Sequence, residues 1–265
     1  MYAFAYQRPD SLKAAVAAAA VDDGAYLAGG MTLLPTLKMR LSRRSSLVDL
    51  SGLAELTGIR VEGDRVHIGA MTRHVEVQDS ALIRKSIPGL ATLAGGIGDP
   101  HVRNRGTLGG SLANSDPAAD YPGAVLALGA TITTDRRQIT AAEFFQGMFT
   151  TALAPGELIT QVTFPIPKRC AYVKFRNPAS RYAVVGVMVA EFSDGVRVAA
   201  TGAGPHVFRL PSFEQALGRC FSPDAVRSLS VGSDGLNDDM HATADYRASL
   251  VSVMAARAVS AALAG

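Results

Sequence analysis

The stretch from Gly95 to Pro122 constrains this chain more than any other. Its sequence, GGIGDPHVRNRGTLGGSLANSDPAADYP, is rich in glycine and polar turn residues and has almost no helical periodicity, so we expect loops here and not core. A second small-residue turn, Ala28 to Thr32, follows an apolar step further upstream. Paired glycines allow sharp turns and a close approach of the backbone to a ligand. Two such turns predict one anionic ligand, such as a pyrophosphate, held by N–H groups from both loops.

The composition is that of a globular protein. The 265 residues are 48% hydrophobic and 18% charged, enough for one large domain or two moderate ones. The formal net charge is only +3. The densest basic run, Lys38 to Arg44, is interrupted by apolar residues and predicts the solvated face of a helix. Because aromatic and basic residues do not alternate, we do not expect a nucleic-acid partner.

The N-terminus and the cysteines favour a reduced, cytoplasmic protein. The first residues have no basic segment followed by a long apolar one, as a signal peptide would, and the apolar run Ala14 to Val21 is too short to span a bilayer. We therefore expect no transmembrane segment. Cys170 and Cys220 are too few for an all-cysteine iron–sulfur cluster, and we expect both to be buried.

The order of predicted elements indicates an α+β architecture, because short strands and helices alternate without a regular βαβ rhythm. Asp10 or Ser11 can cap a first helix, and Thr32 a second over 33–41. Ala124–Leu128 suits either a helix or a strand. The Pro-rich step Pro165-Ile166-Pro167 marks the expected domain boundary. Further helices are expected at 74–79, 88–93 and 246–263, and strands at 26–27, 47–50, 59–62, 66–69, 130–134, 157–164, 182–192 and 196–201.

The sequence contains no recognised motif for catalysis by side chains. There is no GxxxxGK[ST] or GxSxG motif, a GxGxxG beginning at Gly202 fails at Val207, and the histidines lack zinc-site spacing. Asp99 could form an acid–base pair with Asp116 or Asp120, but for Asp99 and Asp116, which lie in Pro-rich turns, we favour caps on the backbone. We therefore predict neither catalytic side chains nor a metal site.

Several sequence blocks together resemble the FAD-binding, or medium, subunit of the molybdenum hydroxylases, the xanthine dehydrogenase and aerobic carbon monoxide dehydrogenase group. The resemblance covers nearly the whole chain. A lone AGG would be weak, but the order and spacing of the blocks are specific. The blocks are YQRP at 6–9, AGGMTLLP at 28–35, IGAMTRH at 68–74, IGDPHVRNRGTLGGSLANSDPAADYP at 97–122 and KFRNPASRYAVVGV at 174–187.

This resemblance implies a two-domain fold. Residues 1–166 would form a two-lobed FAD-binding domain of the vanillyl-alcohol-oxidase (PCMH) type, with the break between lobes near 55–60. Residues 167–265 would form a small sheet-plus-helix domain. That division agrees with the Pro-rich boundary found from the residues themselves.

The resemblance also implies which residues bind FAD. The first turn would wrap the pyrophosphate, and the second would close on the same phosphates and on the flavin side. The first set is Leu27, Ala28, Gly29, Gly30, Met31, Thr32 and Leu33, and the second is Thr107, Leu108, Gly109, Gly110 and Ser111. Independently of the family, a helix that follows Gly30 would attract an anion to its N-terminus.

Other positions are implied one by one. Asp120 would hydrogen-bond a ribose-type hydroxyl, with a cap on Tyr121-Pro122 as the alternative. Ile97 and Gly98 would lie against the flavin. Ile159 would be an apolar flavin contact, although a strand residue is core by default. Arg176 would reach the flavin ring, with Lys174 as a competing alignment and a surface position as the alternative for either.

Met31 departs from the family pattern. Relatives commonly carry a polar residue there, whereas a thioether cannot donate a hydrogen bond to a phosphate. The chain would then rely more on backbone donors to hold the cofactor.

The implied function is electron transfer by FAD within a molybdenum hydroxylase. Electrons would come from a small 2Fe-2S subunit, itself supplied by a large molybdopterin subunit, and pass to NAD⁺, a quinone or oxygen. The complex would be a hetero-oligomer, for example a dimer of heterotrimers. Two alternatives remain open: a self-contained flavoenzyme resembling UDP-N-acetylenolpyruvoylglucosamine reductase, and a scaffold subunit that has lost its flavin.

Overall fold

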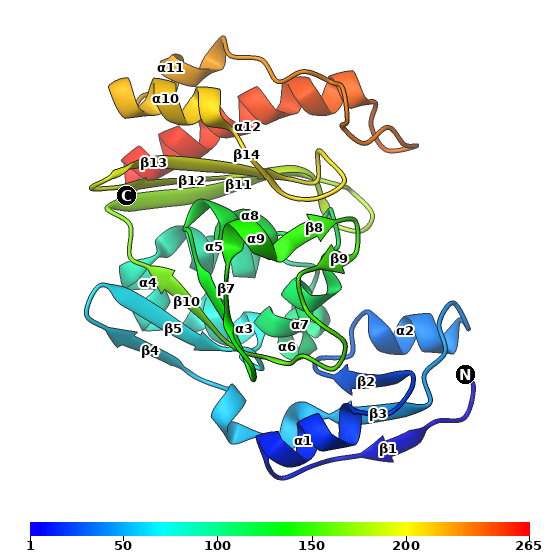
Figure 1. Ribbon diagram of the computed structural model, residues 1–265. Coiled ribbons are helices and arrows are strands. Elements are labelled where there is room, and N and C mark those ends of the chain that lie inside the picture. Colours follow the sequence, from blue (N-terminus) through cyan, green and yellow to red (C-terminus); the bar gives the residue numbers. More distant parts are fainter.

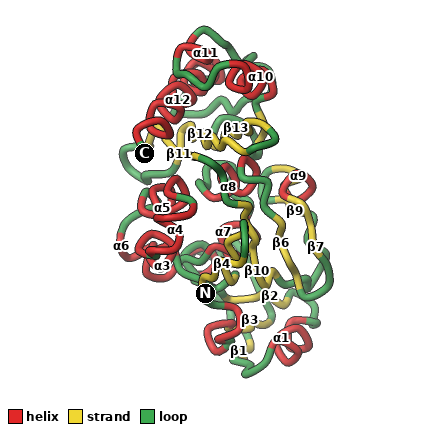
Figure 2. Tube along the Cα trace, turned by 90° about the vertical axis from the view of Figure 1, so that its left-hand side faces the viewer, coloured by secondary structure: helices red, strands yellow, loops and turns green.

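The computed structural model describes residues 1–265 and shows three parts that follow one another along the molecule (Figures 1 and 2). The first carries a small parallel sheet. The second carries a larger antiparallel sheet and most of the short helices. The third is an antiparallel sheet with helices on its outer face. This mixed arrangement confirms the predicted α+β class.

The first part is built around three short parallel strands. They are β1 (Ala5–Gln7), β2 (Gly24–Leu27) and β3 (Ser46–Asp49), in the order β1-β3-β2. Helix α1 (Leu12–Ala19) packs on β3 and is capped by Ser11, whose side chain accepts from the Ala14 N–H. Helix α2 (Leu33–Lys38) follows β2, and two 3₁₀ turns, η1 (Leu50–Gly52) and η2 (Ala54–Leu56), lead to the second part. In this order β2 is an edge strand, and one of its two edges pairs with no other strand.

A five-stranded antiparallel sheet forms the second part, in the order β4-β5-β10-β6-β7. The central strand, β10, comes last in the sequence and pairs with β5 on one side and β6 on the other. The sheet is therefore complete only when the chain has reached residue 165. Its strands are β4 (Ile59–Glu62), β5 (Arg65–Gly69), β6 (Thr131–Thr134), β7 (Gln138–Thr140) and β10 (Ile159–Pro165), with the hairpin β8 (Phe145–Gly147) and β9 (Thr150–Thr151) beside them. Its helices are α3 (His74–Asp79), α4 (Ala81–Ser86), α5 (Pro88–Gly95), α6 (Pro100–Arg105), α7 (Leu108–Asn114), α8 (Tyr121–Ala127) and α9 (Ala141–Phe144).

The glycine-rich stretch is helical and partly core, which corrects the sequence-based prediction of loops. It contains α6, α7 and the start of α8, and every residue of α8 is buried. The small residues explain this, because they let a helix approach its neighbours closely. A Cβ on Gly109 would lie 2.7 Å from the Ala70 Cβ, beside β5. Helix α8 is enclosed on all sides and so has no apolar stripe, whereas α6 buries none of its residues and α7 only three, so periodicity could not reveal any of them.

The third part is a four-stranded antiparallel sheet, buried on both faces. Its strands are β11 (Arg169–Arg176), β12 (Ala183–Phe192), β13 (Gly195–Thr201) and β14 (Phe208–Arg209), in sequence order. Along β12, Met188 packs into the core of the second part, whereas Val187 and Val189 pack under the outer helices. Those helices are α10 (Pro211–Arg219), α11 (Asp224–Arg227) and α12 (Ala244–Ala264) (Figure 1). The sheet thus joins two cores.

Helix α12 is long and apolar enough to cross a membrane by length and composition, with a hydropathy of 1.3 over the most apolar window. Half of that window is buried inside the protein, and the helix packs along β11 and β12. Packing on this sheet accounts for its apolar residues.

Three local predictions are wrong. Helix α2 ends at Lys38, and Arg40 has a φ of 59°, so the basic run is a turn and not a helix face. Thr32 precedes α2, but its side chain makes no cap hydrogen bond. Cys170 is buried as expected, whereas Cys220 is exposed. The ambiguous segment 124–128 is helical in α8.

Arg247 anchors α12 to the sheet beneath it, and we predict that Arg247→Met lowers the free energy of unfolding by about 2–4 kcal/mol. The side chain is only 4% exposed. Its Nη1 donates to the Val184 and Gly202 carbonyls at 2.7 and 3.0 Å, and its Nη2 donates to Asp239. Urea denaturation measures the change. Arg257→Met, at an exposed position of the same helix, is the control and should be near neutral; equal effects of the two would contradict this anchor.

Candidate functional site

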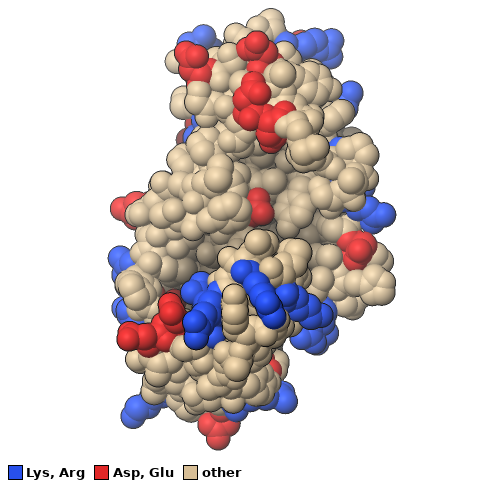
Figure 3. Space-filling model, turned by 90° about the vertical axis from the view of Figure 1, so that its right-hand side faces the viewer, with Lys and Arg blue, Asp and Glu red and all other residues tan.

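A cavity of about 400 Å³ lies where the three parts meet. Its walls come from β2 and the following loop, from the residues around α7, and from a short stretch of the third part, Ser180 to Tyr182. Figure 3 shows the hollow on this face of the molecule, with basic side chains gathered beside it. The glycine-rich stretch and the first small-residue turn, far apart in sequence, therefore form one site.

The loop from Gly29 to Leu33 carries a run of backbone donors. The N–H groups of these residues donate no hydrogen bond to any other group of the chain. Gly30 has a φ of 73°, a left-handed conformation that glycine adopts at little cost. Because the loop leads into α2 and α2 has no side-chain cap, these N–H groups remain available at the cavity wall. Such a cluster of N–H groups suits an anion such as a pyrophosphate.

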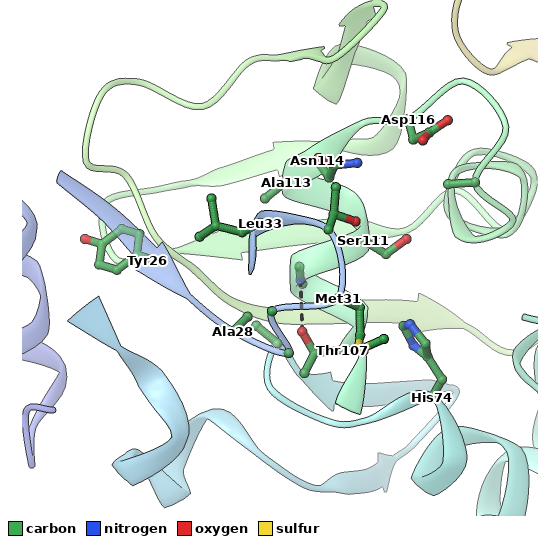
Figure 4. A pocket seen from close by; sticks show the side chains of 18 of the residues that line it. Tyr26, Ala28, Met31, Leu33, His74, Thr107, Ser111, Ala113, Asn114 and Asp116 are labelled. Carbon is green, nitrogen blue, oxygen red and sulfur yellow. Dashed lines mark hydrogen bonds between the residues drawn. The ribbon is translucent and has the colours of Figure 1, made fainter. Parts of the chain in front are cut away.

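The second glycine pair is the first turn of α7, and its donors are already used. Thr107 caps this helix: its Oγ1 accepts from the Gly110 N–H at 3.2 Å (Figure 4), and its carbonyl accepts from Ser111. The Leu108 and Gly109 N–H groups donate to Thr72 and Ala70. The expectation of free donors in both turns is therefore met only in the first, and the second turn contributes shape.

The two turns touch each other through glycine. A Cβ on Gly29 would collide with the Arg105 carbonyl and lie 2.7 Å from the Gly106 Cα. A Cβ on Gly110 would lie 3.4 Å from the Ala28 Cβ and 2.9 Å from the Thr107 Oγ1. The close contact of these backbones holds the first part against the second and forms the floor between them.

Asp120 lies at the wall of the cavity within a buried cluster. It is 5% exposed; the Tyr172 hydroxyl donates to its Oδ1 at 2.5 Å, and the Lys174 ammonium to its Oδ2 at 2.8 Å. Burial raises the pKa of Asp120, while Lys174 and Tyr172 act in the opposite direction. Asp120 makes no cap hydrogen bond to α8, so the capping alternative is wrong. Of the two residues considered for the flavin contact, Lys174 is paired with Asp120 and Arg176 is exposed, and neither lines the cavity.

His74 is a cavity residue that sequence reasoning missed. It is 5% exposed, its ring lies 5.3 Å from that of Tyr121, and its Nδ1 has no hydrogen-bond partner (Figure 4). Burial, with the nearby Arg103 charge, lowers its pKa to about 4, so the imidazole is neutral at pH 7. Asp99 and Asp116, by contrast, cap the backbone as predicted, accepting from Val102 and Ala118 at 2.9 Å.

The structure brings together most of the residues proposed from the sequence. Leu27 belongs to β2, Leu108 is fully buried in α7 and Arg176 is exposed; these three do not line the cavity. Residues that line it without having been predicted include Tyr26 and Arg44 in the first part. The predicted residues in its wall are Ala28, Gly29, Gly30, Met31, Thr32, Leu33, Ile97, Gly98, Thr107, Gly109, Gly110, Ser111, Asp120 and Ile159.

Comparison with known proteins decides the family. Residues 2–167 match the model of the FAD binding domain in molybdopterin dehydrogenase. The chain belongs to this family. It is 35% identical over 273 residues to the nicotine 6-hydroxylase medium subunit of Paenarthrobacter nicotinovorans, with 97% of this chain and 96% of the relative covered.

Two solved structures share the fold over nearly their whole length. Carbon monoxide dehydrogenase from Hydrogenophaga pseudoflava matches with a TM-score of 0.89 at 33% identity, covering 98% of this chain and 97% of that one. Quinoline 2-oxidoreductase from Pseudomonas putida 86 matches with a TM-score of 0.90 at 29% identity, covering 100% and 98%. The chain is thus an oxidoreductase subunit of the FAD-binding, medium type, and FAD is its cofactor.

The residues present fit FAD. Unpaired N–H groups of residues 29–33 suit its phosphates, and the cavity has both apolar walls and polar groups, as a cofactor site requires. The buried Nδ1 of His74 and the close approach of glycine backbones are consistent with a pocket shaped for a large ligand.

We predict that His74 makes the stability of the ligand-free chain pH-dependent. Its pKa is about 4 in the folded chain, against the ordinary value of 6.5 for histidine, so the unfolded state binds a proton first as the pH falls. Its stabilising contribution is complete above pH 6.5 and is lost toward pH 4, by about 3 kcal/mol. Urea denaturation across this range should show a shallower fall for His74→Gln than for the wild type. His101→Gln, at an exposed position, should retain the wild-type slope; an unchanged slope in His74→Gln would contradict the assignment.

Proposed function

We propose that this chain holds FAD with the pyrophosphate on the N–H groups of residues 29–33. The observation that carries this proposal is that run of unpaired donors at the cavity wall. Charge-assisted hydrogen bonds from several N–H groups to one anion add to one another, and the N-terminus of α2 contributes in the same direction. Backbone donors also explain how Met31, which cannot donate, is tolerated.

The isoalloxazine ring lies, in this proposal, at the end of the cavity formed by Ile97, Gly98 and the third part. Asp120 supplies a polar group to its wall, and Lys174, buried beside Asp120, pairs with the carboxylate. Bound FAD supplies the redox chemistry, and the protein supplies orientation, access and electrostatics. The neutral His74 adds no charge to this environment.

We further propose that the chain works as the electron-transfer subunit of a molybdenum hydroxylase. Its partners would be a large molybdopterin subunit and a small 2Fe-2S subunit, with an acceptor such as NAD⁺, a quinone or oxygen, in the cytoplasm. Support comes from the relative's description as a medium subunit, which implies other subunits. Co-purification with large and small subunits expressed beside it tests the assembly, and purification of this chain alone from such a mixture would contradict it.

We also propose that the chain has two domains, with the boundary at the Pro-rich step near residue 166. FAD would be held by residues 1–166, with the lobes meeting near 55–60, and residues 167–265 would close the flavin end. The chain segment between β10 and β11, residues 166–168, and the two 3₁₀ turns before β4 support these positions.

We predict that Gly110→Val abolishes FAD binding and leaves the chain folded. The new side chain would project from the first turn of α7 into the cavity, toward Ala28. Titration of the purified chain with FAD, followed by quenching of flavin fluorescence, measures the dissociation constant. Gly218→Val is the control, because a Cβ at this exposed helical position meets nothing within 4 Å. Wild-type affinity in Gly110→Val would place FAD elsewhere, and absence of FAD binding in the wild type would overturn the proposed site.

A further inference from the structure

Arg44 is an unpaired cation in the cavity wall. It lies in the connection between α2 and β3 and lines the cavity together with Ala25 and Tyr26. Its Nε is buried without a hydrogen-bond partner, and no carboxylate of the chain forms an ion pair with its guanidinium. Its neighbour Arg43 differs, because it is exposed and lies over the Tyr2 ring at 5.6 Å.

An unpaired, half-buried guanidinium is costly in a folded chain. A buried donor without a partner loses its hydration and gains nothing in return, and the cost is larger when the group is charged. The planar guanidinium presents several N–H donors in a fixed fork, which suits oxygen and ring-nitrogen acceptors of a nucleotide. A nucleotide in the cavity would supply those acceptors.

The strand register places Arg44 at one end of the cavity. Ser46 pairs with Gly24 and Asp49 with Leu27, so Arg44 lies near the beginning of β2, whereas the donor loop at 29–33 follows the end of β2. At about 3.3 Å per residue the strand separates these two points by roughly 16 Å. The cavity wall also includes Asp120, at the N-terminus of α8, and Tyr182, in the third part, where we place the flavin. The donor loop therefore lies between Arg44 and the end proposed for the flavin.

We infer that Arg44 binds the adenosine half of the dinucleotide through acceptor atoms of the adenine or its ribose. The inference rests on the proposed function, since it requires the pyrophosphate at residues 29–33. With the phosphates there and the flavin toward the third part, the adenosine extends along β2 toward Arg44. Tyr26 forms the adjacent wall, held by a hydrogen bond from its hydroxyl to the Gly156 carbonyl at 3.0 Å. Arg44 is thus a specificity residue, which distinguishes FAD from FMN.

The test compares the wild-type chain, Arg44→Met and Arg43→Met, each checked for wild-type circular dichroism and melting temperature. Dissociation constants are measured for FAD and FMN by fluorescence quenching and for ADP by calorimetry. Loss of charged hydrogen bonds should weaken FAD and ADP binding about tenfold in Arg44→Met and leave FMN binding unchanged. Arg43→Met should match the wild type for all three ligands.

The outcomes separate this inference from the function on which it rests. Wild-type affinity of Arg44→Met for ADP, or an equal loss for ADP and FMN, would overturn the role of Arg44 while FAD binding by the wild type keeps the proposed site. If Arg43→Met weakened ADP binding as much as Arg44→Met, the effect would come from general surface charge, and the role of Arg44 would also be overturned. A wild-type chain that binds neither FAD nor ADP would instead overturn the proposed function.

Discussion

The whole site depends on the contact between the Gly29 backbone and the backbone of Arg105 and Gly106. No side chain fits between them, so the edge of the first part lies directly on the second. This contact holds the loop after β2 open, with five consecutive N–H groups directed to no acceptor of the chain. Free donors in a row are costly unless a ligand or water pairs with them, which is why the arrangement indicates a binding site and not a structural turn.

The opposite end of the cavity is held by a different kind of interaction. Asp120, Tyr172 and Lys174 form a buried polar cluster between α8 and β11, with each oxygen of the carboxylate bonded. A buried charge pair contributes little net stability but fixes geometry, because any displacement leaves a charge unpaired. The cluster therefore sets the position of the third part relative to the second. One end of the cavity is thus fixed by the Gly29 backbone contact and the other by the Asp120–Lys174 pair. Because both are formed within the chain itself, the cavity is largely preformed.

Much of the site could be predicted from the sequence, because glycine marks positions where the backbone turns sharply or approaches another group closely. Small residues alone predict the turns at 28–32 and 107–111, and both line the cavity. What each turn does could not be predicted. Thr107 accepts from the Gly110 and Ser111 N–H groups, and carbonyls near β5 accept from those of Leu108 and Gly109. These pairings depend on the helix α7, which lies inside a glycine-rich stretch. Alternation along β11 could not separate Lys174 from Arg176, because residues two apart in a strand share a face. Their burial separates them, with a shift in strand register just before Arg176. Arg44 and His74 carry no local signal, because tertiary packing alone brings them to the cavity.

Amide hydrogen exchange of the full chain, with and without FAD, tests the central claim most directly. The amides of residues 29–33 have no acceptor within the chain and should exchange fast without ligand, then become protected when FAD is added. The amides of residues 108–111 are already bonded and should be protected in both states. Protection by FAD at 29–33 is the result this account predicts. FAD binding that leaves 29–33 unprotected would contradict it, because the pyrophosphate would then have to be held by other groups.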